Sequence, residues 1–261
     1  MKNRDAEVKY FRILVLLIVG INSVTAEPLK DVVKKIKPSV VGVGFYAPMA
    51  TISHQLKGTG FVIGDGRYVV TNSHVILAVP QEENIKFNEV VFVPKGRQTG
   101  IAKVKQVFTD EEHDLSILEL TKPLPAVRLL SETENLDDGA DVAMTGFPIG
   151  AVLGLYPATH RGIVAAYSPN VISAANSTQL SEAYLASLRN PFMVYQLDIT
   201  AYPGNSGSPV YNAETGEVFA VINKVFIKET KESAITAPSG ITYAIPVEHV
   251  YALARKHGIS L

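Results

Sequence analysis

The sequence has 261 residues, with 24 basic side chains, 25 acidic side chains and no cysteine. Charge is nearly balanced and no basic run is interleaved with aromatic residues, which excludes the electrostatic footprint of a nucleic-acid-binding protein. The lack of cysteine excludes a fold stapled by disulfides, and the length suits one large unit of β structure.

The N-terminus has the pattern of a secretory signal peptide. Four basic residues accompany two acidic ones ahead of an apolar run at 13–21, and Val24 and Ala26 have the spacing that a signal peptidase reads. We expect cleavage after Ala26, which moves the formal charge from −1 to −3. The run is well short of the roughly 20 residues that span a bilayer, so a retained anchor is the less favoured alternative. Residues 1–26 are therefore predicted to be a signal peptide, and residues 27–261 a periplasmic or secreted domain.

Two groups of short strands follow, separated by a loop-like stretch at 121–139. The first group, with a hairpin turn at Asp65-Gly66, covers 39–46, 58–63, 67–72, 89–93, 101–108 and 115–120. The second covers 141–147, 159–167, 193–200, 208–211, 217–227 and 240–245. Two runs of about six strands predict an all-β fold of two packed six-stranded antiparallel barrels, at about 39–120 and 140–246, although periodicity alone also allows sandwiches.

Two segments do not fit the strand pattern. Apolar residues after Pro246 fall at helical spacing, which predicts a closing helix at 247–257. The stretch between 167 and 192 reads as a long loop with a short helix near 180–188. Long loops in compact domains are usually functional or mobile.

A serine lies between two glycines in the segment 203–209, PGNSGSP. A tight turn explains that pattern by itself, so a functional interpretation needs partners elsewhere. His74 follows a strongly apolar strand, and Asp114 stands at the mouth of another, which places a base and an acid in the first barrel and Ser206 in the second. A serine hydroxyl becomes a nucleophile when an imidazole takes its proton and an acid orients that imidazole. The sequence therefore predicts the triad His74, Asp114 and Ser206, with an oxyanion hole at Gly204-Asn205-Ser206 whose donors are the backbone N–H groups of Gly204 and Ser206.

At these residues the sequence resembles the chymotrypsin-fold serine proteases and, within them, the HtrA (Deg) family. The resemblance runs from about Ser39 to Leu253 and is carried by GTGFVI, YVVTNSHV, DLSIL, DVAMTGFPIG, THRGIVAAY, GNSGSPV, GEVFAVIN and ITYAIPVEHV. It implies a serine endopeptidase of protein quality control that forms an acyl-enzyme on protein or peptide substrates without a cofactor. By analogy with the family it also implies a homotrimer, and a loop at 167–192 that orders the oxyanion hole.

The sequence departs from its relatives at three points. HtrA proteins usually continue into PDZ domains, and this chain reaches Leu261 without one, so we expect no peptide sensing by such a module. Ser208 replaces a glycine that is frequent in the family, and it is small enough not to obstruct the loop. Asn205 occupies the position of the aspartate that pairs with a new N-terminal amine in digestive members, so no activation of that type is expected.

The expected substrate pocket contains Thr200, Asn223, Lys224 and Tyr243. Trypsin-like members carry an aspartate six residues before the serine, and Thr200 in that place argues against cleavage after lysine or arginine. Glutamyl endopeptidases resemble the serine loop, but Ile222 stands where they carry a histidine. The prediction is a preference for small or medium apolar residues, which the cation of Lys224 could reverse.

The sequence also bears on three other classes of protein: an α/β-hydrolase, a metalloprotein and a non-catalytic binding protein. An α/β-hydrolase needs G-x-S-x-G and the chain order serine, acid, histidine, but position 208 is Ser and the 55 residues after Ser206 contain no aspartate. No HExxH motif, cysteine or histidine pair at ligand spacing indicates a metal site. The alternative that stays open is a non-catalytic protease-fold protein that binds other proteins, or acts as a chaperone, in the cell envelope.

Overall fold

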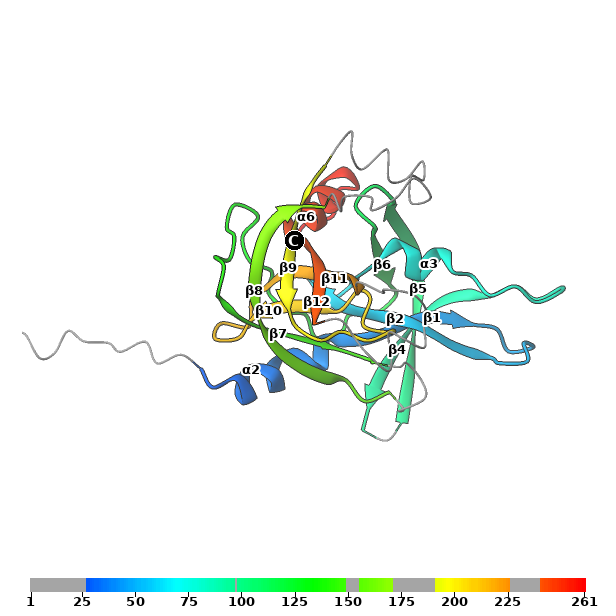
Figure 1. Ribbon diagram of the computed structural model, residues 1–261. Coiled ribbons are helices and arrows are strands. Elements are labelled where there is room, and N and C mark those ends of the chain that lie inside the picture. Colours follow the sequence, from blue (N-terminus) through cyan, green and yellow to red (C-terminus); the bar gives the residue numbers. More distant parts are fainter. Residues whose placement is uncertain (1–26, 97, 149–154, 171–190, 226–239) are drawn as a thin grey trace, which may run out of the picture.

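The fold consists of two closed antiparallel barrels, as the sequence predicted. A computed structural model describes residues 27–96, 98–148, 155–170, 191–225 and 240–261. Within these residues, six strands of the first half of the chain close into one barrel and six of the second half close into another. Figure 1 shows the strands of the first barrel, coloured from blue through cyan to blue-green, beside those of the second, coloured from green to red.

The first barrel has the neighbour order β1-β2-β3-β6-β5-β4 and is closed by pairing of β1 with β4. Its strands are β1 (Val40–Tyr46), β2 (His54–Ile63), β3 (Tyr68–Thr71), β4 (Asn88–Lys95), β5 (Gln98–Asp110) and β6 (Leu115–Leu120). Strand β2 begins four residues earlier than predicted because His54–Leu56 pair with β1 beyond a bulge at Val43/Gly44. A Cβ at residue 44 would lie 2.0 Å from the Gln55 carbonyl oxygen, so the close approach of the strands there requires glycine.

The second barrel has the order β10-β11-β12-β9-β8-β7. Its strands are β7 (Asp141–Gly146), β8 (Ala158–Pro169), β9 (Met193–Asp198), β10 (Pro209–Asn212), β11 (Val218–Val225) and β12 (Ile241–Pro246). Each predicted strand of the second group corresponds to one of these. The helix expected near 180–188 lies outside the described residues.

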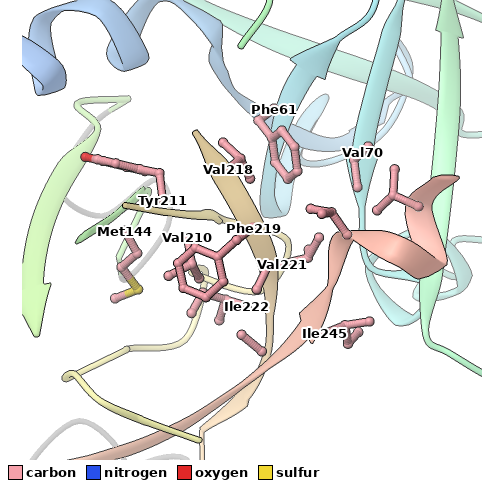
Figure 2. Packing of buried hydrophobic residues seen from close by; sticks show 14 of the residues in the cluster. Phe61, Val70, Met144, Val210, Tyr211, Val218, Phe219, Val221, Ile222 and Ile245 are labelled. Carbon is pink, nitrogen blue, oxygen red and sulfur yellow. The ribbon is translucent and has the colours of Figure 1, made fainter. Parts of the chain in front are cut away.

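One apolar cluster joins the barrels. Figure 2 shows Phe61 and Val70 of the first barrel in the same cluster as Val218 and Val221 of the second. These four side chains are fully buried. Burial of apolar surface therefore fixes the position of one barrel relative to the other, and any site that draws residues from both is held by this packing.

Helices cover the outside of the barrels. Helix α2 (Leu29–Ile36) was not predicted; it buries Val32 and Ile36 and continues into a short 3-10 turn, η1 (Lys37–Ser39). Helix α3 (Ser73–Leu77) follows β3 and was not predicted. Helix α6 (Val247–Lys256) closes the chain and contacts β5 and β6 of the first barrel as well as β11 and β12 of the second. Among the described residues, no helix is both long and apolar enough to span a membrane.

Candidate active site

The structure brings His74 and Asp114 together although 40 residues separate them. His74 lies in α3, directly after β3, and Asp114 ends the turn between β5 and β6. The imidazole Nδ1 is 2.7 Å from the carboxylate Oδ2, the distance of a charge-assisted hydrogen bond. The side chain of His74 is 45% exposed and that of Asp114 is 19% exposed. The ring therefore meets solvent while its acid partner is mostly enclosed.

Neighbours of His74 hold the other atoms of Asp114. The carboxylate Oδ1 accepts hydrogen bonds from the Ser73 hydroxyl at 2.7 Å and from the His74 backbone N–H at 2.9 Å. Burial by itself would raise the pKa of Asp114, but the hydrogen bonds from His74 and Ser73 and the charge of His74 outweigh it, so the pKa lies below its ordinary 3.8. The carboxylate is thus kept ionised.

The backbone of Asp114 has φ +51°, the left-handed region that aspartate tolerates better than most residues. Its carbonyl oxygen accepts hydrogen bonds from the Asn72 side-chain Nδ2 at 3.0 Å and from the Ser73 backbone N–H at 3.2 Å. The roles of Asn72 and Ser73, which precede His74 in the segment TNSHV, were not predicted from the sequence. Polar residues just before a candidate base were the available signal.

The serine loop is tied to the first barrel. The Thr59 backbone N–H donates to the Ser206 carbonyl oxygen at 2.9 Å, and the Thr59 hydroxyl donates to the Gly204 carbonyl oxygen at 2.7 Å. Gly207 has φ +83°, and a Cβ there would lie 2.1 Å from the Thr59 carbonyl oxygen. The glycine after the serine is therefore needed both for its conformation and for contact between the barrels.

Gly58 shows that the serine loop and α3 share one location. A Cβ at residue 58 would lie 2.7 Å from Val75 Cγ2 and 3.0 Å from the Ser206 carbonyl oxygen. Val75 follows His74 directly. The backbone at Gly58 therefore contacts both the serine loop and the helix that carries the imidazole. The Ser206 hydroxyl itself donates to the Asn223 carbonyl oxygen at 3.3 Å and forms no hydrogen bond with His74 within the described residues.

Two backbone donors of the serine loop are uncommitted. The N–H groups of Asn205, Gly207 and Ser208 donate to the carbonyl oxygens of Tyr202, Ile222 and Asn205 respectively. Those of Gly204 and Ser206 have no acceptor in the part of the chain that the structure describes. They are the two donors expected to serve an oxyanion, and Gly204 has φ +98°, a conformation for which glycine is suited.

Asn205 and Ser208, two residues of the serine loop, are both fully buried. The Asn205 amide and the Ser208 hydroxyl have no hydrogen-bond partner in the described structure. A Cβ at Gly146 would lie 2.0 Å from the Ser208 Oγ and 2.8 Å from the Asn205 Oδ1. Ser208 therefore fits here because residue 146 has no side chain.

The four pocket candidates come from three neighbouring segments. Asn223 and Lys224 lie on β11, and Tyr243 on β12 is the pairing partner of Lys224. Thr200 follows Ile199, whose carbonyl oxygen accepts the Thr242 hydroxyl of β12 at 2.7 Å. The Lys224 side chain lies outside what the structure describes. Asn223 connects this region to the site, since its carbonyl oxygen accepts the Ser206 hydroxyl. Its side-chain Oδ1 is buried and has no hydrogen-bond partner among the described residues.

Comparison with known proteins identifies the family. Residues 58–221 match the model of the trypsin-like peptidase domain. The serine protease HTRA1A of Danio rerio is 30% identical over 85% of this chain and 40% of its own length. A probable periplasmic DegP-like serine endoprotease of Pseudomonas putida is 30% identical over 74% of this chain and 33% of its own length.

Solved structures agree on the fold. An HtrA-type protease with a decapeptide superposes with a TM-score of 0.61 at 20% identity, over 89% of this chain and 68% of that chain. A serine endoprotease from Yersinia pestis gives 0.59 at 21% identity, over 89% and 67%.

The chain therefore belongs to the trypsin-like peptidases, a class of serine protease hydrolases, and its relatives there are HtrA and DegP-like proteases. This confirms the resemblance seen in the sequence. The chain spans between a third and two fifths of the length of these curated relatives.

Proposed function

We propose that this protein is a serine endopeptidase in which Ser206 is the nucleophile, His74 the general base and Asp114 the acid that orients it. The observation that carries the proposal is the 2.7 Å hydrogen bond between His74 Nδ1 and Asp114 Oδ2, because it directs Nε2 away from the acid. Membership of the trypsin-like peptidases supports the same roles.

The reaction begins with a rotation of the Ser206 hydroxyl from the Asn223 carbonyl to the imidazole. Leaving one hydrogen bond between uncharged groups costs about 1 kcal/mol, little beside the barrier of peptide hydrolysis. His74 Nε2 takes the proton as Oγ attacks the substrate carbonyl, and the ionised carboxylate of Asp114 stabilises the imidazolium. The N–H groups of Gly204 and Ser206 bind the oxyanion, each worth about 3 to 4 kcal/mol in a well-placed case.

The intermediate then breaks down in two stages. The imidazolium gives its proton to the leaving amine, the C–N bond breaks, and an acyl-enzyme remains on Ser206. Water enters, His74 takes a proton from it, and a second oxyanion collapses to release the acid and restore the hydroxyl. Every proton removed by the imidazole is returned, so no cofactor is required.

For specificity we propose small or medium apolar residues before the cleaved bond. Thr200 supplies no charge at the pocket position six residues before the serine, and its neighbours on β11 and β12 are Asn223 and Tyr243. Lys224 pairs with Tyr243 along the backbone, and a side chain turned into the pocket would favour an acidic residue instead.

For location we propose residues 1–26 as a cleaved signal peptide and residues 27–261 as a protease domain in the periplasm or outside the cell. The first 26 residues lie outside the described structure, and the support is their sequence pattern together with relatives that are named periplasmic. Protein substrates and a homotrimer are carried over from the HtrA family as part of the same proposal. So is ordering of the oxyanion hole by the segment at 167–192, most of which lies outside the described residues.

A fluorophosphonate probe tests the proposal, because it reacts only with an activated serine. We expect labelling of the wild-type protein and its loss in Ser206→Ala and His74→Ala, with casein hydrolysis lost in parallel. A folded wild type that neither labels nor cleaves casein would refute the proposal. Cleavage sites mapped by mass spectrometry would then decide between apolar and acidic preference.

One observation favours the second candidate, a non-catalytic binding or chaperone-like protein. The Ser206 hydroxyl is bonded to Asn223 and not to His74, as it would be in a scaffold that no longer uses its serine. That protein would suppress aggregation of an unfolded client equally well with Ser206→Ala, and it would not label.

A further inference from the structure

We propose that Ser73 is a positioning residue of the active site, whose hydroxyl sets the orientation of the Asp114 carboxylate toward His74. This inference rests on the proposed function, since it gives Asp114 its partner in the reaction. It assigns a role to a side chain that is 3% exposed and that touches neither substrate nor the reacting atoms.

The two oxygens of the carboxylate have separate tasks. Oδ2 faces the imidazole Nδ1, whereas Oδ1 accepts the Ser73 hydroxyl at 2.7 Å and the His74 backbone N–H at 2.9 Å. A carboxylate rotates about its last bond over a broad range, so one hydrogen bond does not fix its plane. Two donors on Oδ1 do, and they hold the lone pair of Oδ2 in line with the imidazole N–H.

The hydroxyl is not needed for the helix in which it lies. Asn72 is the residue that precedes α3, and no side chain caps that end. The Ser73 Oγ has Asp114 as its single side-chain partner in the described structure. A serine that only filled space would have no reason to direct its hydroxyl at this one acid.

The backbone supports the same assignment. Asp114 has a positive φ, and its carbonyl oxygen is held by the Asn72 side chain and the Ser73 N–H. Ser73 therefore binds Asp114 twice, once through the main chain and once through the carboxylate. Exchanging the side chain removes the second contact and leaves the first, so the two effects are separable.

The test compares Ser73→Ala with Ser116→Ala in the purified, exported protein. Ser116 is a matched control, because it is also fully buried, lies two residues after Asp114, and bonds the Thr109 hydroxyl at 3.0 Å instead of the acid. A hydrogen bond to a charged group corresponds to about a tenfold to hundredfold change in rate when it is lost. We expect kcat on a peptide substrate to fall by that factor in Ser73→Ala with KM unchanged, and both to stay at wild-type values in Ser116→Ala.

Proton NMR gives a readout that does not depend on turnover. The His74 Nδ1–H that is shared with Asp114 resonates far downfield, and we expect its signal to shift or broaden in Ser73→Ala and to be unaltered in Ser116→Ala. Ser73→Thr, which restores a hydroxyl, should recover both the signal and kcat. Should Ser73→Ala fail to fold, Ser73→Cys offers a weaker donor of similar size for the same comparison.

Each outcome decides the assignment. An unchanged kcat and an unchanged resonance in folded Ser73→Ala would overturn it while the proposed protease function stands. A wild type without turnover would remove the protease function, and the resonance alone would then show whether Ser73 orients Asp114. Equal losses in Ser73→Ala and Ser116→Ala would also overturn it, because they would indicate general damage to the turn.

Discussion

Two histidine–aspartate pairs lie at opposite ends of the turn between β5 and β6. They share the same kind of hydrogen bond and differ in how far the histidine is exposed. Asp110 ends β5 and bonds His113 Nδ1 at 2.8 Å, and Asp114 closes the same turn and bonds His74 Nδ1 at 2.7 Å. Both carboxylates have a pKa below 3.8, since hydrogen bonds and the charge of the histidine outweigh burial. The local pairing alone does not separate the two.

What separates them is the surroundings of the ring. His113 stacks on His249 of α6 with ring centres 4.0 Å apart, and it forms a T-shaped contact with Phe192 whose ring centres are 4.8 Å apart. Its side chain is 21% exposed, whereas that of His74 is 45% exposed and makes no ring contact in the described structure. A histidine can serve as a base only if its second nitrogen can reach a substrate, and the turn shows one enclosed ring and one open ring.

The largest expected effect breaks one pair and spares the other. Asp114→Asn should lower kcat/KM by about 10⁴-fold, because the amide favours the wrong tautomer of the imidazole. Asp110→Asn should leave kcat/KM close to the wild-type value. Steady-state hydrolysis of one peptide by both variants makes the comparison, and similar losses would mean that the pairs are not functionally distinct.

His249, which stacks on the enclosed His113, should make folding stability depend on pH. Burial, followed by the charge of His113, lowers the pKa of His249 to about 4 from 6.5, while Asp110 and Glu112 raise it by less. The unfolded chain then binds a proton that the folded chain refuses between those two values. The contribution of His249 to folding stability is therefore fully present above pH 6.5 and is lost as pH falls toward 4.

His249→Phe isolates this contribution. The ring and its stacking are kept, but no proton can bind, so the slope of unfolding free energy against pH should flatten between pH 6.5 and 4. Urea unfolding at three pH values in that window measures the slope. The two carboxylates act in a lower window: their stabilisation is present above pH 3.8 and is lost as pH falls further, so that part of the curve should be common to both proteins.

A smaller effect concerns the enclosed carboxylate. Asp110→Ala removes the hydrogen bond to His113, which is partly screened by solvent, and should cost about 1 kcal/mol of unfolding free energy. Fluorophosphonate labelling of the folded variant should not change. A loss of labelling at temperatures where the variant is folded would show that the pairs communicate through the turn.

The smallest effect is expected at Phe192. Its ring forms T-shaped contacts with both His113 and His249, with ring centres 4.8 and 5.2 Å away. Such aromatic pairs contribute roughly 0.5 to 1.5 kcal/mol beyond their area, and Phe192→Leu keeps most of the area. We expect a decrease of about 0.5 kcal/mol in thermal or urea unfolding. No decrease at all would mean that the contact between His113 and α6 is stabilised by the stacked histidines alone.

The sequence was most informative where a pattern repeats locally. Short runs rich in β-branched and apolar residues, separated by turn signals, predicted all twelve described strands and hence two barrels. The start of β2 was missed, since Gly44 and Gln55 approach each other only across a bulge. Helix α2 was missed although Val32 and Ile36 have helical spacing, because two apolar positions are a weak pattern.

The candidate site divides in the same way. The residue types and their order along the chain predicted His74, Asp114 and Ser206 as a set, because none of the three is informative alone. The bond between Ser73 and Asp114 spans 41 residues, and serine is too common a residue for its position to be informative alone. The enclosure of His113 was likewise not predictable from the sequence, because it comes from the packing of α6.

The contact between His113 and α6 also has a consequence for the order in which the protein is made. The first barrel, with His74 and Asp114, leaves the ribosome well before residue 249 is synthesised, and domains tend to fold in that order. Until then the turn that carries Asp114 lacks the ring on which His113 stacks. Ser206 is also made before α6, so a nascent chain already holds all three proposed catalytic residues before His249 is present. Synthesis of α6 therefore completes the packing around a turn that was made more than a hundred positions earlier.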